Sequence, residues 1–283
     1  MKIFKVPQIK IPKKPTIKAM LSCATLSLAL FMSLFTQAEQ MSKLEQAIAS
    51  EERAEKNVNR DQYRHPLETL TFFGFKPEMT VVELIPGGGW YTEILASALK
   101  GSGKLYGAHY PDSGRKDYYS SSRKALEKKV ASEILFNEMQ ITDFHPRFKN
   151  SIAPKGTADL VLTFRNLHNF KIAGVRQMYQ DAFAALKSGG IIGVVEHRMP
   201  ASQSWDDNKR TGYFPEQLAI ELAEEAGFKL VARSEINANP KDTTMHPKGV
   251  WTLPPALRLG EQDIDKYLAI GESDRMTLKF IKP

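Results

Sequence analysis

Cysteine is almost absent from this chain of 283 residues, which has a single one, Cys23. Because Cys23 falls in an N-terminal stretch with the features of a removable leader, the mature protein is expected to have no disulfide, no thiol nucleophile and no cysteine metal ligand. His65, His145 and His246 lack the spacing of metal ligands, so no metal site is expected. Low-complexity linkers and internal repeats are also missing, and the remaining length favours one large domain.

The first 38 residues have the three-part order of a secretory signal. Residues 1–18 hold six lysines and no acidic residue, and residues 19–35 are apolar apart from small polar residues and Cys23. Thr36-Gln37-Ala38 then offers small residues to a signal peptidase, which predicts cleavage after Ala38 and a periplasmic or secreted protein. The alternative is an uncleaved membrane anchor, but the apolar run is at the short edge of a membrane span and contains Ser, Thr and Cys, which favours cleavage. With an uncleaved anchor, the membrane would be contacted through the leader alone.

A strong charge of one sign is missing once the leader is set aside. The whole chain carries +7, and removing the six leader lysines lowers this to +1. Short basic pairs such as Arg123-Lys124 and Lys128-Lys129 do not make a stripe. A nucleic acid partner is therefore not expected.

The most informative stretch runs from Thr80 to Leu99, TVVELIPGGGWYTEILASAL. It begins as a short apolar run, breaks at Pro86 and three glycines, and resumes with helical spacing, which predicts a strand, a turn and a helix. Glycines at 87–89 let a ligand approach the backbone closely, and the following helix points its free N–H groups at the same place. This pattern favours a small molecule bound at the end of the strand. The alternative is a glycine turn that only connects strand to helix.

Strands and helices alternate along most of the chain. We expect an exposed helix at 39–60 and a second at 67–75, which together make an N-terminal helical extension (39–78) before the main domain (79–283). Strands are predicted at 80–84, 104–109, 133–140, 158–164, 191–195, 228–236 and 276–281, with helices at 90–99, 120–130, 175–186, 215–226 and 262–268. This order indicates βαβ units and a parallel sheet, and the last two strands, with no long helix between them, indicate an antiparallel end.

Several segments together resemble the class I S-adenosylmethionine-dependent methyltransferases. They are VVELIPGGGWYTEIL, the strands LYGAH and DLVLTF, and the segment GGIIGVVEHR. With SEINANPKDT, HPKGVWTLPPALRLG and GESDRMTLKF near the C-terminus, the chain from about Asp61 onward resembles a family of predicted methyltransferases bearing an export signal. The resemblance implies a Rossmann-like α/β fold, with a seven-stranded sheet whose last strand is antiparallel and helices on both faces.

The resemblance also implies S-adenosylmethionine as the cofactor. Gly87, Gly88 and Gly89 would wrap its methionine end, and Glu83 would order the turn; Ile85 replaces the first glycine of the usual signature. The nicotinamide-binding motif G-x-G-x-x-G would need a glycine at position 92, where this sequence has Thr92. S-adenosylmethionine is therefore preferred to NAD as the cofactor.

Two further positions concern the nucleoside. Strand two ends at His109, where methyltransferases usually place an acid that grips both ribose hydroxyls, so either Asp112 reaches in or affinity is weaker. His109 as a surface histidine is the alternative. Asp143 and Phe144 follow the third predicted strand, where the family packs adenine; Asp143 as a helix N-cap is the alternative.

Polar residues also follow the two central apolar strands. Asn166 and His168 lie in RNLHN after 158–164, and Glu196 and His197 end the next strand. Ligands in open α/β sheets lie at the carboxyl ends of strands, so Asn166 should face the cofactor, His168 and His197 are candidate general bases, and Glu196 would orient them. The alternative is a set of loop groups that cap helices. Trp251, in a proline-bounded apolar segment, either covers the substrate pocket or plugs the sheet edge.

The leading functional hypothesis is an exported S-adenosylmethionine-dependent methyltransferase with a small-molecule acceptor. A catalytically inactive ligand-binding module on the same fold is the alternative, since S-adenosylmethionine is made in the cytosol. A third hypothesis is a partner-binding protein that uses the N-terminal helix and the C-terminal proline segment.

Overall fold

The computed structural model describes residues 43–206 and 210–283. The predicted leader and its cleavage site lie outside these residues. Residues 43–283 form one compact unit. Within the described ranges, no helix combines the length and the apolar character that crossing a membrane would require.

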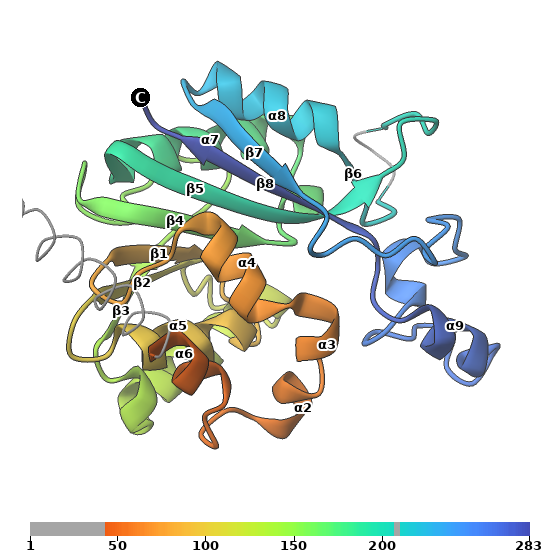
Figure 1. The fold of residues 1–283 in the computed structure, drawn as a ribbon, viewed down its shortest axis with the longest axis horizontal. Helices are drawn as coiled ribbons and strands as arrows, with labels where there is room; N and C mark the ends of the chain where they lie inside the picture. The colour runs from red at the N-terminus through yellow and green to blue at the C-terminus, as the bar shows by residue number, and fades with distance from the viewer. Residues whose placement is uncertain (1–42, 207–209) are drawn as a thin grey trace, which may run out of the picture. The chain divides into compact units, whose positions relative to one another are not determined.

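One mixed sheet organises this unit (Figure 1). Its strands lie in the order β3-β2-β1-β4-β5-β8-β7, and a two-residue strand, β6, pairs with β5. β8 runs antiparallel to β5 and β7, whereas the other pairs are parallel. The predicted fold class is therefore confirmed. The strand bounds are β1 Thr80–Leu84, β2 Lys104–His109, β3 Met139–Asp143, β4 Ala158–Phe164, β5 Leu186–Met199, β6 Phe214–Pro215, β7 Lys229–Ser234 and β8 Arg275–Ile281.

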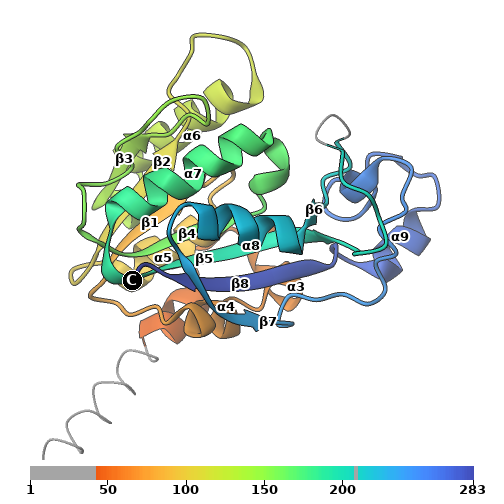
Figure 2. The same ribbon diagram turned by 90° about the horizontal axis from the view of Figure 1, so that it is seen from above.

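Helices cover both faces of the sheet, with α7 and α8 on one side and α4 and α5 on the other (Figures 1 and 2). The apolar strand β4 serves both layers, because successive side chains of a strand point to opposite faces. Val161 packs with the core under α7 and α8, whereas Leu160 and Leu162 pack with the core under α4 and α5. The longer helices are α4 Pro66–Phe73, α5 Trp90–Leu99, α6 Tyr118–Ser132, α7 Ile172–Ala185 and α8 Glu216–Glu225. The short ones are α2 Glu55–Val58, α3 Asp61–Arg64 and α9 Ile264–Ile270, with 3-10 turns η1 Ile134–Phe136, η2 Leu167–Asn169 and η3 Gly249–Thr252.

The prediction of one helix at 39–60 is wrong for its described part. Residues 43–48 are helical, and the chain then turns before α2 and α3. Arg53 explains the turn: it is buried, its Nη1 donates to the carbonyl oxygen of Ile48 (2.7 Å), and its guanidinium holds both carboxylate oxygens of Asp61 at 2.6 and 2.7 Å. A side chain with these local partners stabilises a fold-back that helical periodicity does not reveal.

The predicted strand at 133–140 is also misplaced. Residues 134–136 form η1, and β3 begins only at Met139. Leu135 and Phe136 are buried in the same core layer as α5, so their apolar character reflects packing of a turn rather than membership of the sheet.

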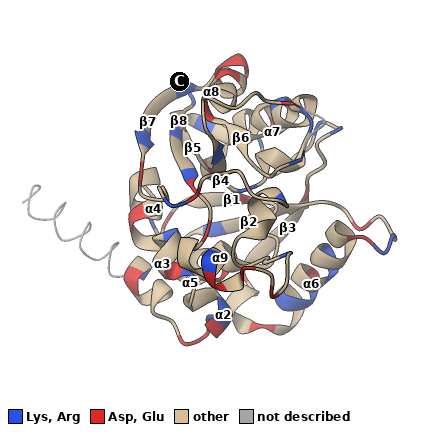
Figure 3. Ribbon diagram, turned by 90° about the vertical axis from the view of Figure 1, so that its right-hand side faces the viewer, with Lys and Arg blue, Asp and Glu red and all other residues tan. Residues whose placement is uncertain are grey.

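Charged residues of both signs are interspersed over the described elements (Figure 3). This mixture is compatible with the near-neutral charge expected for the mature chain. The expectation that nucleic acid is no partner stays a prediction.

Candidate functional site

The glycine turn forms where β1 ends. Ile85, Gly87 and Gly89 have positive φ angles of 49°, 59° and 85°, and Gly89 is the N-cap of α5. Ile85 therefore adopts a left-handed conformation that costs an L-residue about 1–2 kcal/mol, at the position where the usual signature has glycine. A Cβ atom added to Gly88 would meet nothing within 4 Å. The turn thus presents bare backbone to open space.

Glu83 lies beneath this turn and is 3% exposed. It accepts a hydrogen bond from Thr92 Oγ1 (2.7 Å) and so joins the end of β1 to α5. Burial raises the pKa of Glu83 to about 7, an effect that the Thr92 hydrogen bond and nearby Arg165 only partly oppose. The predicted role of Glu83 in ordering the turn stays a prediction.

A cavity of about 370 Å³ lies against the turn. Its volume is within the range of roughly 300–1,000 Å³ that is usual for small-molecule sites. Pocket-lining residues occur within 57–64, 83–91, 118–119, 164–169, 197, 250–256 and 272–273. Gly87, Gly88, Asn166, His168 and His197 all line it, so one cavity brings together most of the predicted cofactor and catalytic residues.

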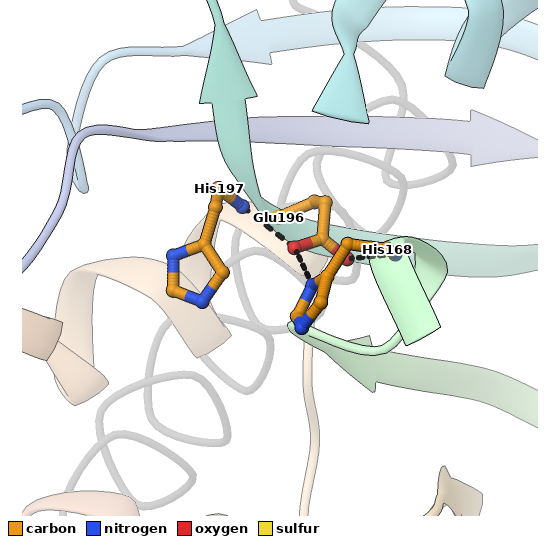
Figure 4. Close-up of side chains that lie close together, drawn as sticks. All are labelled: His168, Glu196 and His197. Carbon is orange, nitrogen blue, oxygen red and sulfur yellow. Dashed lines mark hydrogen bonds and ion pairs between the residues drawn. The ribbon is translucent and has the colours of Figure 1, made fainter. Parts of the chain in front are cut away.

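Glu196 and His168 form a buried pair beside the cavity (Figure 4). Glu196 ends the apolar part of β5, and His168 lies in η2, after the neighbouring strand β4. His168 Nδ1 is 2.8 Å from Glu196 Oε1, so a proton on Nδ1 is donated to the carboxylate and Nε2 is left to accept. The backbone N–H of Leu167 donates to Oε2 at 2.7 Å, and that of His197 donates to Oε1 at 2.7 Å.

His197 contributes a second imidazole. Its ring centroid is 5.1 Å from that of His168, and its Nδ1 lies 2.5 Å from Ser273 Oγ. Burial, together with nearby His168 and Arg165, lowers the pKa of His197 well below its usual value, so this ring is neutral at physiological pH. Trp251 lies across from the pair, with its ring 6.1 Å from His168, and lines the cavity.

The same residues offer little to a metal. Donor atoms of His168, Glu196 and His197 lie within 4.8 Å of one another, and no other such group occurs in the described ranges. Both oxygens of Glu196 already accept N–H groups, so two imidazoles remain, fewer than the three protein ligands of a catalytic zinc site. The arrangement suits a carboxylate-oriented base better than a metal centre.

Asn166 lines the cavity and also forms hydrogen bonds to β1 and β4. Its Nδ2 donates to the carbonyl oxygen of Leu84 (2.9 Å) and to Thr163 Oγ1 (3.2 Å). The amide nitrogen is therefore occupied within the protein, and Oδ1 is the atom left for a ligand.

His109 is buried and does not line the cavity, so the alternative of a surface histidine is wrong. Its Nε2 is 3.1 Å from Ser122 Oγ, which in turn donates to the carbonyl oxygen of Gly87 (3.2 Å). His109 thus supports the glycine turn from behind. Asp112 does not reach in either: it accepts from the Gly114 N–H and pairs with Lys124.

Asp143 and Phe144 also lie away from the cavity lining. Asp143 is the last residue of β3 rather than following it, is exposed, and pairs with Arg123 at 2.7 Å, whereas Phe144 is buried in the core. The N-cap alternative for Asp143 is wrong, because the next α-helix in the chain, α7, begins only at Ile172.

Arginines that the sequence analysis did not predict as site residues form another wall of the cavity. Arg60, Arg64 and Arg165 line the cavity with Glu272. Glu272 accepts from Arg60 Nε at 2.6 Å and from Arg64 Nε at 3.4 Å. Burial alone would raise the pKa of Glu272, but the surrounding arginines lower it to about 2. Only Arg165 had a sequence signal, its place in the RNLHN loop.

Comparison with known proteins gives structural matches only. No family model matches the sequence, and no curated protein matches it. A SAM-dependent methyltransferase from Aquifex aeolicus is 13% identical, with a TM-score of 0.52 over 80% of this chain and 93% of that one.

Two further solved structures are similar at the same level. The [4+2]-cyclase SpnF is 12% identical (TM-score 0.56, 88% of this chain, 96% of that one). A putative sarcosine dimethylglycine methyltransferase from Galdieria sulphuraria is also 12% identical (TM-score 0.52, 80% and 84%). The chain therefore has the fold of the class I S-adenosylmethionine-dependent methyltransferases.

Proposed function

We propose that this protein transfers a methyl group from S-adenosylmethionine to a small-molecule acceptor. The observation that carries the proposal is that Gly88 and His168 line the same cavity. A methyl donor held on the glycine turn would lie beside a base oriented by Glu196. The likeness to solved methyltransferases supports the fold, and the likeness to a cyclase means that the chemistry must be argued from the site.

The residues present fit the methionine end of the donor. Gly88 leaves open space, and the N-terminus of the ten-residue helix α5 favours a negatively charged group there. Tyr118 and Tyr119 line the cavity and offer aromatic faces to a nucleobase. The ribose is the weaker fit, because β2 ends in the inward-bonded His109 and not in a carboxylate.

The chain's own residues would contribute positioning and proton transfer. S-adenosylmethionine supplies the electrophilic methyl group when it is bound. Positioning an acceptor in line with that methyl can lower the barrier by about 7–11 kcal/mol. His168 Nε2 would take the acceptor's proton, a contribution of roughly 10²–10⁴-fold, while Glu196 holds the imidazole in the tautomer that accepts at Nε2.

Export is a second part of the proposal and rests on the N-terminal sequence. The lysine-rich residues 1–18, the apolar run at 19–35 and the small residues before Ala38 support a cleaved secretory signal. Mass spectrometry of the protein recovered from cell fractions tests it. A mature N-terminus at Glu39 in the periplasm or medium is expected, and an intact Met1 in the cytosol would contradict it.

The methyltransferase proposal is tested by calorimetry and by turnover. S-adenosylhomocysteine should bind to the wild type and to the control Ala131→Val, which changes an exposed helix position, but not to Gly88→Val. Transfer of label from S-adenosylmethionine to fractionated small-molecule extracts should then be seen, and should be lost in His168→Gln. Absence of cofactor binding at millimolar concentration would refute the proposal, and binding without turnover would favour a catalytically inactive binding module.

A further inference from the structure

We propose that the cavity contains a carboxylate-binding site centred on Arg165, with Arg64 beside it, and that the methyl acceptor is a small organic acid. Identifying the bound acid as the acceptor rests on the proposed function. The carboxylate-binding site itself rests on the geometry of the cavity alone.

Arg165 is the main observation. Within residues 43–206 and 210–283 its guanidinium makes no hydrogen bond or ion pair, although it lines the cavity. Burial lowers its pKa to about 10; nearby Glu272 opposes this effect, and the cations Arg275 and Arg60 add to it. Its backbone is also held at a φ of 61°, an uncommon conformation for a residue other than glycine. An unpaired cation in a strained turn costs stability, which is typical of groups kept for a ligand.

Arg64 provides a second, independent observation. It is 1% exposed, and its Nη1 and Nη2 are buried without any hydrogen-bond partner. Only its Nε contacts Glu272, and the guanidinium lies over the Trp90 ring at 4.7 Å. Buried N–H groups of this kind are rare unless something absent from the protein itself satisfies them. Arg64 lines the same cavity as Arg165 and adds to the positive charge that an anion bound there would meet.

The charge balance of the cavity lining favours an anion. Three arginines line the cavity, and Glu272, ionised down to about pH 2, offsets one of them. Glu83, with a pKa of about 7, is partly ionised near neutral pH and offsets part of the charge of a second arginine. The remaining excess of between one and two positive charges suits a carboxylate, whose two oxygens match the fork of a guanidinium.

The experiment uses full-length protein and four probes. Butyrate and its neutral isostere butyramide are followed by saturation-transfer NMR. S-adenosylhomocysteine, which has a carboxylate, and 5′-methylthioadenosine, which lacks it, are followed by calorimetry. The variant is Arg165→Asn, because asparagine tolerates a positive φ. The matched control is Arg176→Asn, at an arginine of α7 whose side chain is 42% exposed and pairs with Glu225.

The site and an acidic acceptor are supported by three results together. Saturation transfer to butyrate is lost in Arg165→Asn, it is kept in Arg176→Asn, and butyramide shows none. A second outcome is that Arg165→Asn loses about tenfold or more in S-adenosylhomocysteine affinity, while its 5′-methylthioadenosine affinity is unchanged and butyrate shows no saturation transfer to any protein. This outcome supports the site but overturns the acidic acceptor, since the donor then supplies the carboxylate. Identical behaviour of both variants toward every probe overturns the site itself. Butyrate binding without S-adenosylhomocysteine binding overturns the proposed function and leaves the site standing.

Discussion

Glu196→Gln changes one oxygen into an NH₂ group at the most heavily bonded side chain of the site. Glu196 is fully buried and accepts N–H groups at both oxygens. Oε2 accepts from the backbone of Leu167 (2.7 Å) and His168 (3.4 Å), and Oε1 accepts from the backbone of His197 (2.7 Å) and from His168 Nδ1 (2.8 Å). Glutamine offers one acceptor oxygen, so either orientation turns its NH₂ toward donors.

The two orientations have different chemical consequences. With the NH₂ near Leu167, the backbone N–H there loses its acceptor while His168 keeps its tautomer. With the NH₂ near His168, Nδ1 becomes the acceptor and Nε2 carries the proton, so Nε2 can no longer take one from a substrate. In both cases at least one buried N–H is left facing another donor.

The expected loss of stability follows from this count. A hydrogen bond to a charged group contributes about 1.5–3 kcal/mol, and a buried N–H without an acceptor costs about 1–3 kcal/mol. We therefore expect Glu196→Gln to lower the free energy of unfolding by about 3–5 kcal/mol, with His168→Gln lowering it much less because it leaves the backbone donors satisfied.

Urea unfolding of the wild type and both variants measures this difference. If His168 is the base, methyl transfer, measured where both variants are folded, should fall by roughly 10²–10⁴-fold in His168→Gln, and by a similar factor in Glu196→Gln if the NH₂ group turns toward His168. If Glu196→Gln unfolds within about 1 kcal/mol of the wild type, the assigned network is wrong. If His168→Gln retains full turnover, His168 is not the base.

Three other changes have defined outcomes. Gly88→Val should abolish S-adenosylhomocysteine binding by calorimetry while leaving the melting temperature within a few degrees, because Gly88 lines the cavity and an added Cβ meets no protein atom within 4 Å; retained binding would mean that the turn is only a connector. Glu83→Gln should remove a pH dependence of stability. The pKa of Glu83 in the folded state, about 7, exceeds the ordinary 4.5, so the wild type loses stability as pH rises from 4.5 to 7, by about 3 kcal/mol in all. Glutamine keeps an acceptor for Thr92, and urea melts of the variant should lack this decline. Arg165→Asn should raise the melting temperature or leave it unchanged, since it removes an unpaired cation from beside other arginines; a clear decrease would indicate that Arg165 is held by the protein for stability.

The parts of the fold that were predictable are those with a local signal. β4, with the sequence ADLVLTF, is apolar on both faces because helices cover both sides of the sheet, and its predicted bounds agree with the structure. The turn at Gly87–Gly89 fixes the end of β1 and the start of α5 in the same way. β3 was misplaced because residues 134–136, the contiguous apolar run of this segment, form η1, whereas β3 alternates apolar and polar residues over only five positions.

The site was predictable only where chain position implies spatial position. His168 follows β4, and Glu196 lies near the carboxyl end of the neighbouring parallel strand β5, so their meeting follows from the topology. His109 had the same kind of signal and yet turns inward, because Ser122 of α6 gives its ring a partner inside the protein. Which way a strand-end side chain points depends on the packing of the next helix, and the strand sequence does not contain that information.

The cavity wall formed by residues 57–64 shows most clearly what the sequence could not predict. Trp90 Nε1 donates to the carbonyl oxygen of Asn57 (2.7 Å), and Asn57 Nδ2 donates to Glu93 Oε2 (2.8 Å), so the N-terminal segment is bonded to α5 directly behind the glycine turn. Arg64 then reaches Glu272, more than two hundred residues later in the sequence. Because each bond joins distant segments through ordinary polar residues, no spacing within either segment predicts it. The charge of the cavity is therefore set by tertiary contacts, and a substrate class inferred from the net charge of the chain would have missed it.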